Sequence, residues 1–216
     1  MEITVDPASN PLAGFIPSNP WGTAELVTTD QPTARTLRRQ AKEQYRADLK
    51  RATLQELLPT PPNRGDTIHL ISNGRYDYFT FVSIFLAWLQ NRCTGFYGST
   101  WTMNAGNVTS LLRYYDHGQI AKITVATGTY FYRRESAVAN QLILGLAKRG
   151  QRTKAWENHA KVICMTNGVD FYVAEGSANW TANPRTENNS ISNSPDLYRF
   201  HAAWIEEMFA REEKPK

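Results

Sequence analysis

The sequence predicts an α/β sandwich built on a mixed, mainly parallel β-sheet. Segments typical of strands alternate with segments of helical periodicity along residues 67–148, which favours parallel strands joined by helices. An Asn-Gly pair at 167–168 then separates two short apolar runs, a pattern typical of a β-hairpin because a tight turn needs positive φ angles. The expected sheet is therefore mainly parallel and ends in an antiparallel pair.

Three strand–helix units are expected before the hairpin. Their strands are predicted at 67–72, 94–103 and 121–127, and their helices at 76–89, 104–115 and 131–148. The strand at 67–72 is expected to be buried. Asn104 is a suitable N-cap for the second helix, and Gly150 ends the third. A basic loop contains Lys148, Arg149, Arg152 and Lys154. An amphipathic helix is predicted over 196–211, with an apolar side made of Leu197, Phe200, Trp204 and Phe209.

The chain is expected to have three parts. Residues 1–31 are rich in proline and predict an irregular arm. Residues 32–63 predict a helix, over 33–58, and a proline-rich linker. Residues 64–216 form a single α/β domain. Basic residues crowd the helix at Arg35, Arg38, Arg39, Lys42, Arg46, Lys50 and Arg51. Such a helix can line a nucleic-acid groove or can be a solvated face, and both interpretations stay open.

Composition excludes several classes of protein. The 216 residues carry a net charge of +4, which permits a polyanionic partner. No apolar stretch reaches the roughly 20 residues that a membrane span needs, and no secretory signal is visible, so we expect a cytoplasmic protein. The two cysteines are not part of any metal-ligand spacing, so no metal and no other cofactor is expected.

The hairpin is expected to gather polar residues at one end of the sheet. A two-residue turn gives a register that pairs Thr166 with Val169, Lys161 with Ala174 and His159 with Gly176. His159 and Lys161 then point to the same face, because they are two residues apart. Ser177 would face the other way unless the chain kinks at Gly176, which glycine permits.

The chemistry of these residues is specific. A neutral imidazole, here His159, is a nucleophile near neutral pH. The ammonium of Lys161, the hydroxyl of Ser177, the amide of Asn179 and the N–H groups of the glycine turn all donate to anionic oxygen. Glu187 could orient the imidazole. A nucleophile surrounded by phosphate donors indicates phosphoryl transfer. Near the predicted strand ends, Ser99, Thr100, Trp101 and Thr127 could line the cleft.

The pattern His159-x-Lys161, Gly176-Ser177-x-Asn179 and Glu187 resembles the signature of the phospholipase D superfamily, and above all its small bacterial nucleases with one motif per chain. The match covers about 158–190. It implies a phospholipase D-like α/β/α sandwich in which the nucleophile, His159, forms a phosphohistidine. It also implies that Lys161 and Asn179 bind phosphate, that Ser177 and Gly176 support the substrate, and that Glu187 steadies the imidazole.

The resemblance further implies a metal-independent phosphodiesterase, in the first place a DNA nuclease. A single motif implies a homodimer, because the family's reaction uses one histidine as nucleophile and a second as acid. Arg38, Arg39 and Lys42 are candidate DNA contacts. Thr166 departs from the family, which usually has Asp there. Two alternatives therefore stay open: a weak or inactive nucleic-acid-binding module on the same fold, and a phospholipid phosphodiesterase.

Overall fold

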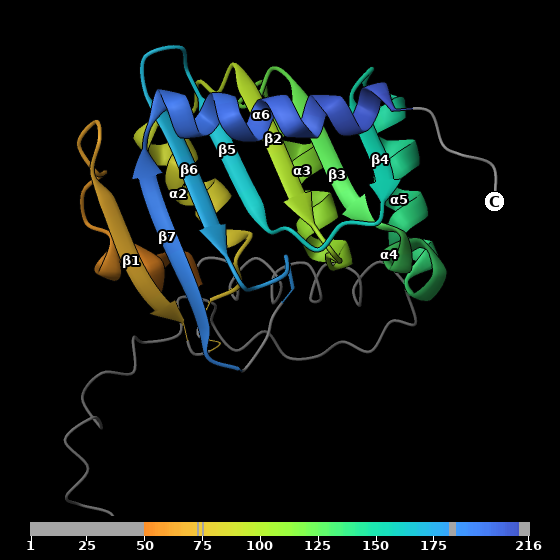
Figure 1. The fold of residues 1–216 in the computed structure, drawn as a ribbon, viewed down its shortest axis with the longest axis horizontal. Helices are drawn as coiled ribbons and strands as arrows, with labels where there is room; N and C mark the ends of the chain where they lie inside the picture. Colours follow the sequence, from red (N-terminus) through yellow and green to blue (C-terminus); the bar gives the residue numbers. More distant parts are fainter. Residues whose placement is uncertain (1–49, 73, 75, 182–184, 212–216) are drawn as a thin grey trace, which may run out of the picture. The chain divides into compact units, whose positions relative to one another are not determined.

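A single seven-stranded sheet organises the described part of the chain. The computed structural model describes residues 50–72, 74, 76–181 and 185–211. The strands lie in the order β1-β7-β6-β5-β2-β3-β4 (Figure 1). Their bounds are β1 Thr67–Ser72, β2 Gly95–Thr100, β3 Ile123–Gly128, β4 Arg152–Trp156, β5 Val162–Thr166, β6 Phe171–Gly176 and β7 Glu187–Asn193.

Helices cover both faces of this sheet. They are α2 Thr80–Trp88, α3 Ala105–Asp116, α4 Thr129–Arg134, α5 Ser136–Ala147 and α6 Pro195–Ala210. In Figure 1, α6 crosses the front face, while α2, α3 and α5 lie behind. A large apolar core fills the rear layer and a smaller one lies under α6. The predicted α/β sandwich with a mixed sheet is confirmed.

The expected majority of parallel strands is not found. Within the described residues, β2–β3 and β3–β4 are parallel, whereas β1–β7, β7–β6, β6–β5 and β5–β2 are antiparallel. The difference arises because β7 and β1 extend the hairpin on its far side. β1 is therefore an edge strand rather than a buried one, and Ile71 is 67% exposed.

Two strands were not expected. β4 occupies the predicted basic loop, where Arg152 pairs with Glu206 of α6 and Lys154 Nζ donates to the carbonyl of Arg211 at 2.6 Å. The basic side chains can remain on a strand because β4 is at the sheet edge. β7 is a polar sequence, and its strand is stabilised by pairing with β1 and β6 rather than by apolar alternation.

The helices differ from the prediction in two places. The helix expected over 131–148 is split into α4 and α5 at Glu135, which leaves helical geometry at φ −116° and ψ 46°. The buried side of α6 consists of Tyr198, His201 and Ile205, whereas Phe200 is 63% exposed. The predicted N-cap of α3 is confirmed, because the Asn104 side chain accepts a hydrogen bond from the backbone N–H of Asn107 at 2.9 Å.

Part of the predicted N-terminal organisation lies outside the described residues. This applies to the arm over 1–31 and to Arg38, Arg39 and Lys42. Residues 50–57 are helical, in agreement with the predicted helix. Leu54 and Leu58 from this region are buried in the large core, so the described end of the helix is part of the domain.

The hairpin forms with a register two residues away from the expected one. Thr166 pairs with Phe171, and the turn is the four-residue segment 167–170. Asn167 shapes it by accepting hydrogen bonds from the N–H groups of Val169 and Asp170, both at 2.9 Å, and Gly168 has φ +92°. A two-residue shift keeps every side chain on its expected face.

Candidate active site

The motif residues lie along one end of the strands, where β2, β3, β4 and β6 terminate and β5 begins. In Figure 1 the segment 157–161 runs along these strand ends, past β3 and β2. Side chains hold its backbone in place of a strand ladder. Ser99 Oγ donates to the carbonyl of Ala160 at 3.0 Å, Asn158 Nδ2 donates to Ser99 Oγ at 2.8 Å, and the Tyr78 hydroxyl donates to the carbonyl of Lys161 at 3.1 Å. The position of His159 is therefore fixed by its neighbours.

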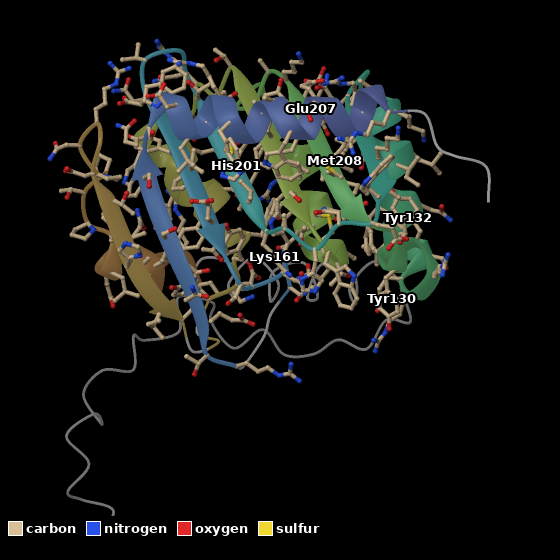
Figure 2. All side chains as sticks on the ribbon, viewed as in Figure 1. Tyr130, Tyr132, Lys161, His201, Glu207 and Met208 are labelled. Atoms are coloured by element: carbon tan, nitrogen blue, oxygen red, sulfur yellow. The ribbon has the colours of Figure 1, made fainter. Side chains whose placement is uncertain are left out.

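His159 and Lys161 are in direct contact. The imidazole of His159 is exposed, whereas Lys161 is only 6% exposed. Lys161 Nζ lies 2.7 Å from His159 Nδ1, 3.4 Å from Nε2 and 2.6 Å from the His159 carbonyl oxygen. Figure 2 shows Lys161 at the centre of the lower edge of the sheet. The lysine is thus held against the proposed nucleophile.

The electrostatic environment of Lys161 lowers the pKa of its ammonium group. Burial lowers the pKa of the ammonium below its usual 10.5, and the negative charge of Glu187 opposes this effect without cancelling it. Partial burial disfavours the charged form of an amine. An anionic phosphate bound beside Lys161 would add a second negative charge and stabilise the ammonium, so substrate binding and protonation of Lys161 should reinforce each other.

Gly176 allows the two halves of the motif to approach each other. Its N–H donates to the carbonyl of Lys161 at 3.3 Å. A Cβ at this position would lie 2.4 Å from Asn189 Oδ1, 2.8 Å from a ring carbon of Tyr78 and 2.9 Å from the Asn188 carbonyl oxygen. Gly176 is not among the glycines with positive φ. The glycine is therefore required for close packing, and the kink expected from the sequence is not the reason for it.

Ser177 meets Glu187 because the chain continues alongside β7 beyond Gly176. The backbone N–H of Ser177 donates to the carbonyl of Asn188 at 3.0 Å, and the N–H of Asn188 donates back to Ser177 Oγ at 3.2 Å. The hydroxyl of Ser177 donates to the carboxylate of Glu187. The carboxylate of Glu187 therefore accepts a hydrogen bond from a hydroxyl and lies near the ammonium of Lys161, and both stabilise its negative charge.

Asn179 is positioned by the residue that follows it. Trp180 is fully buried, its N–H donates to Thr100 Oγ1 at 3.2 Å, and its carbonyl accepts from the side chain of Asn107 at 2.9 Å. The amide oxygen of Asn179 is itself buried and has no hydrogen-bond partner among the described residues. A buried amide oxygen without a partner is costly.

The structure separates the predicted site residues into those at the site and those elsewhere. His159, Lys161, Gly176, Ser177 and Glu187 are linked by the contacts described above, and Asn179 follows in the same turn. Thr166 lies at the opposite end of β5. There its Oγ1 accepts from the N–H of Gly168 at 2.9 Å and donates to the carbonyl of Asp170 at 2.7 Å. Its role is to stabilise the hairpin turn.

The other cleft candidates have mixed outcomes. Ser99 and Thr100 are buried and serve as hydrogen-bond partners within the edge, and Thr127 is fully buried. Trp101 is partly exposed beside His159, with ring centroids 5.5 Å apart. Sequence reasoning missed Tyr78 and Tyr130. A search for aromatic residues just after predicted strand ends would have found Tyr130, which follows β3.

Several solved structures are similar to this chain. The phospholipase D family member Nuc from Salmonella typhimurium superposes with a TM-score of 0.50 at 17% identity, covering 69% of this chain and 99% of Nuc. NucT from Helicobacter pylori gives 0.47 at 11% identity, over 67% and 97% of the two chains. The archaeal chromatin protein TrmBL2, whose structure shows a mode of DNA binding, gives 0.47 at 13%, over 84% and 68%.

No protein-family model and no curated protein matches the chain. The likeness to Nuc therefore rests on structure, and it shows the fold: a phospholipase D-like α/β sandwich, as the motif had implied. Among the described residues, no helix is long and apolar enough to cross a membrane, and no three His, Cys, Asp or Glu side chains gather as a metal-ligand group.

Proposed function

We propose that the chain is a metal-independent phosphodiesterase, specifically a nuclease, that acts through a phosphohistidine on His159. One observation carries the proposal. An exposed imidazole is held by a largely buried lysine, next to a glycine turn and a Ser177–Glu187 pair, at the edge of a phospholipase D-like sheet. This arrangement offers a nucleophile, a cation and several donors at one position, as displacement at phosphorus requires.

The contact between Lys161 and the imidazole suggests how substrate triggers the reaction. In the structure the ammonium of Lys161 contacts ring nitrogen Nδ1 of His159 at 2.7 Å. A phosphodiester offers it an anionic acceptor, and charge-assisted hydrogen bonds are stronger than neutral ones. The released imidazole then attacks phosphorus, and the bond to the leaving oxygen breaks. That oxygen takes a proton from an acid, and water later hydrolyses the phosphohistidine.

The acid is proposed to be His159 of a second copy of the chain. The sequence holds one motif, while this scheme uses two imidazoles on opposite sides of one phosphate. His159 is exposed at the strand ends, so a two-fold axis beside it would bring the two rings together. The active form is therefore proposed to be a homodimer with a composite site.

The alternative of an inactive binding module rested on Thr166. Since this residue shapes the hairpin turn at the far end of β5, its identity supports neither loss nor gain of chemistry at His159. A phospholipid substrate would require recognition of acyl chains, and the experiment below separates that class from nucleic acid.

The purified protein should hydrolyse single-stranded DNA and a small phosphodiester such as methyl p-nitrophenyl phosphate in the presence of EDTA. Phosphatidylcholine vesicles and RNA complete the substrate panel. Hydrolysis that disappears in EDTA and returns with a divalent cation would contradict the proposed mechanism. Hydrolysis of the phosphatidylcholine vesicles and of no nucleic acid would identify the protein as a lipid phosphodiesterase and not as a nuclease.

The activity should fall at alkaline pH because Lys161 must be charged to hold phosphate. Its pKa is lowered below the usual 10.5 by burial, so kcat/KM should decline as pH rises through a pKa below that value. Lys161→Arg, whose guanidinium stays charged, should remove this alkaline limb, whatever its effect on the rate at neutral pH. A limb that persists unchanged in Lys161→Arg would assign the titration to another group.

A further inference from the structure

Two aromatic rings are arranged in a row with the imidazole of the proposed nucleophile. Trp101, which follows β2, stacks on Tyr130 of α4 with centroids 4.6 Å apart and planes at 7°. The indole of Trp101 is in turn 5.5 Å from the imidazole of His159, at an angle of 47°. The row leads from the reacting histidine to Tyr130, which is 40% exposed.

A pocket opens along this ring stack. Its volume is about 260 Å³, and its lining includes Trp101, Tyr130, Met103, Asn104, Arg134 and Val138. The size is below the roughly 300–1,000 Å³ of pockets for drug-sized ligands, and it suits a single flat ring system. Arg134 contributes a guanidinium that lies 5.8 Å from the Tyr130 ring centre and donates to the Tyr130 hydroxyl at 2.9 Å. The carboxylate of Glu135, which also lines the pocket, lies 4.0 Å from it.

The contact between Trp101 and Tyr130 is fixed by the packing of the strand ends. Gly128, the last residue of β3, packs directly against Trp101, and a Cβ there would lie 2.5 Å from indole Cδ1 and 2.8 Å from the Trp101 carbonyl oxygen. Tyr130 follows two residues later in the first turn of α4. In Figure 2, Tyr130 lies lower than Tyr132, toward the edge where β2 and β3 end. The fold therefore presents Tyr130 and Trp101 on the same side as His159.

We propose that the Trp101–Tyr130 stack binds an unpaired nucleobase of a nucleotide that flanks the scissile phosphate. The proposal rests on the proposed nuclease function and names a substrate class for it. Aromatic side chains beside an arginine are the usual platform for bases of single-stranded nucleic acid, since every base offers a π-face. The Trp101 ring centre is 5.5 Å from the ring centre of His159, so the stack lies next to the position of the reacting phosphate.

A base can enter this pocket only when it leaves the duplex, because a base in a duplex is stacked between its neighbours on both faces and is paired along its edge. The site should therefore favour single-stranded over duplex substrate. An acyl chain would fit the apolar lining, but it would not use the exposed guanidinium or the parallel ring planes. A nucleobase, in contrast, can stack on the rings and accept a hydrogen bond from the guanidinium.

The test measures binding of fluorescein-labelled oligonucleotides by anisotropy, in the His159→Ala background so that cleavage does not interfere. The probes are a single-stranded DNA, the same length with abasic sites throughout, and a blunt duplex. Trp101→Leu should weaken binding of the base-bearing single strand by about 5- to 150-fold. It should leave the abasic strand and the duplex unchanged within about twofold. Tyr130→Leu should also weaken binding of the base-bearing single strand. It replaces a side chain that is 40% exposed and not a buried one.

Tyr132→Leu is the matched control, because Tyr132 is on the same helix but points away from Tyr130 at two residues' distance. It should bind all three probes like the parent protein. Equal losses for base-bearing and abasic strands would overturn the base-stacking site, and so would no loss in either variant. Hydrolysis of methyl p-nitrophenyl phosphate, which has no base, reports separately on the proposed function. It should persist in the Tyr130→Leu chain that retains His159.

Discussion

Replacing His159 by alanine should lower kcat by at least about 10⁴-fold on DNA and on methyl p-nitrophenyl phosphate, because it removes the proposed nucleophile. The side chain is exposed, so the free energy of unfolding should change by only about 0.5 kcal/mol, as is usual at the surface. Initial rates and a thermal unfolding curve measure the two effects separately.

His117→Ala is the matched control for this variant. His117 is also exposed and lies at the end of α3, away from the motif, so its removal should leave kcat unchanged. Protein that has reacted with a labelled substrate and is then quenched in alkaline SDS, where the P–N bond of a phosphohistidine survives, should carry the labelled phosphoryl group in the parent chain and none in His159→Ala. Retention of more than about one per cent of the parent rate by His159→Ala would assign the nucleophile to another residue.

A heterodimer of parent and His159→Ala chains should lose nearly all activity on DNA. One imidazole can still attack, but no second imidazole protonates the leaving oxygen, and general acid catalysis contributes about 10²–10⁴-fold. Differently tagged chains, refolded together and purified on both tags, give this species. Sedimentation of the parent protein should first show twice the monomer mass.

The same heterodimer offers a sharper measurement on methyl p-nitrophenyl phosphate. Nitrophenolate is a good leaving group without protonation, so the first turnover should survive and release one equivalent per dimer. Half or more of the parent rate on DNA would mean that each chain acts alone. The acid would then be a residue of the same chain. His69, which lines a hollow together with Ser177 and Glu175, would be the first to replace.

The local features of the site could be predicted from the sequence because short-range chemistry determines them. The contact of His159 with Lys161, the N-cap at Asn104 and the hairpin at Asn167-Gly168 all depend on residues within a few positions of each other. The register was wrong by two, because the side chain of Asn167 closes a four-residue turn where the Asn-Gly pair suggested a two-residue one. The error left the site intact since strand faces alternate with period two.

The features that the sequence did not predict depend on distant partners. β7 has little apolar alternation and exists because β1 and β6 pair with it. The backbone around His159 is held by Tyr78 and Ser99, which are 83 and 61 residues away along the chain from the carbonyls that they bind. The stack of Trp101 on Tyr130 likewise joins two strand ends that only the parallel pairing of β2 and β3 brings together. No local pattern encodes such contacts.

The hairpin turn has a consequence for how the sequence of this region can change in length. Lys161 and Gly176 are neighbours across β5 and β6, and their separation along the chain is the sum of two strand lengths and one turn. A residue inserted within 162–166 would reverse the faces of all positions on its far side and detach the lysine from the glycine turn. Residues inserted within 167–170 only lengthen a loop, at an entropic cost that grows slowly. Related sequences should therefore vary in length at the turn. A pattern that describes them should allow a variable number of residues between Lys161 and Gly176 and should not require a particular residue at position 166.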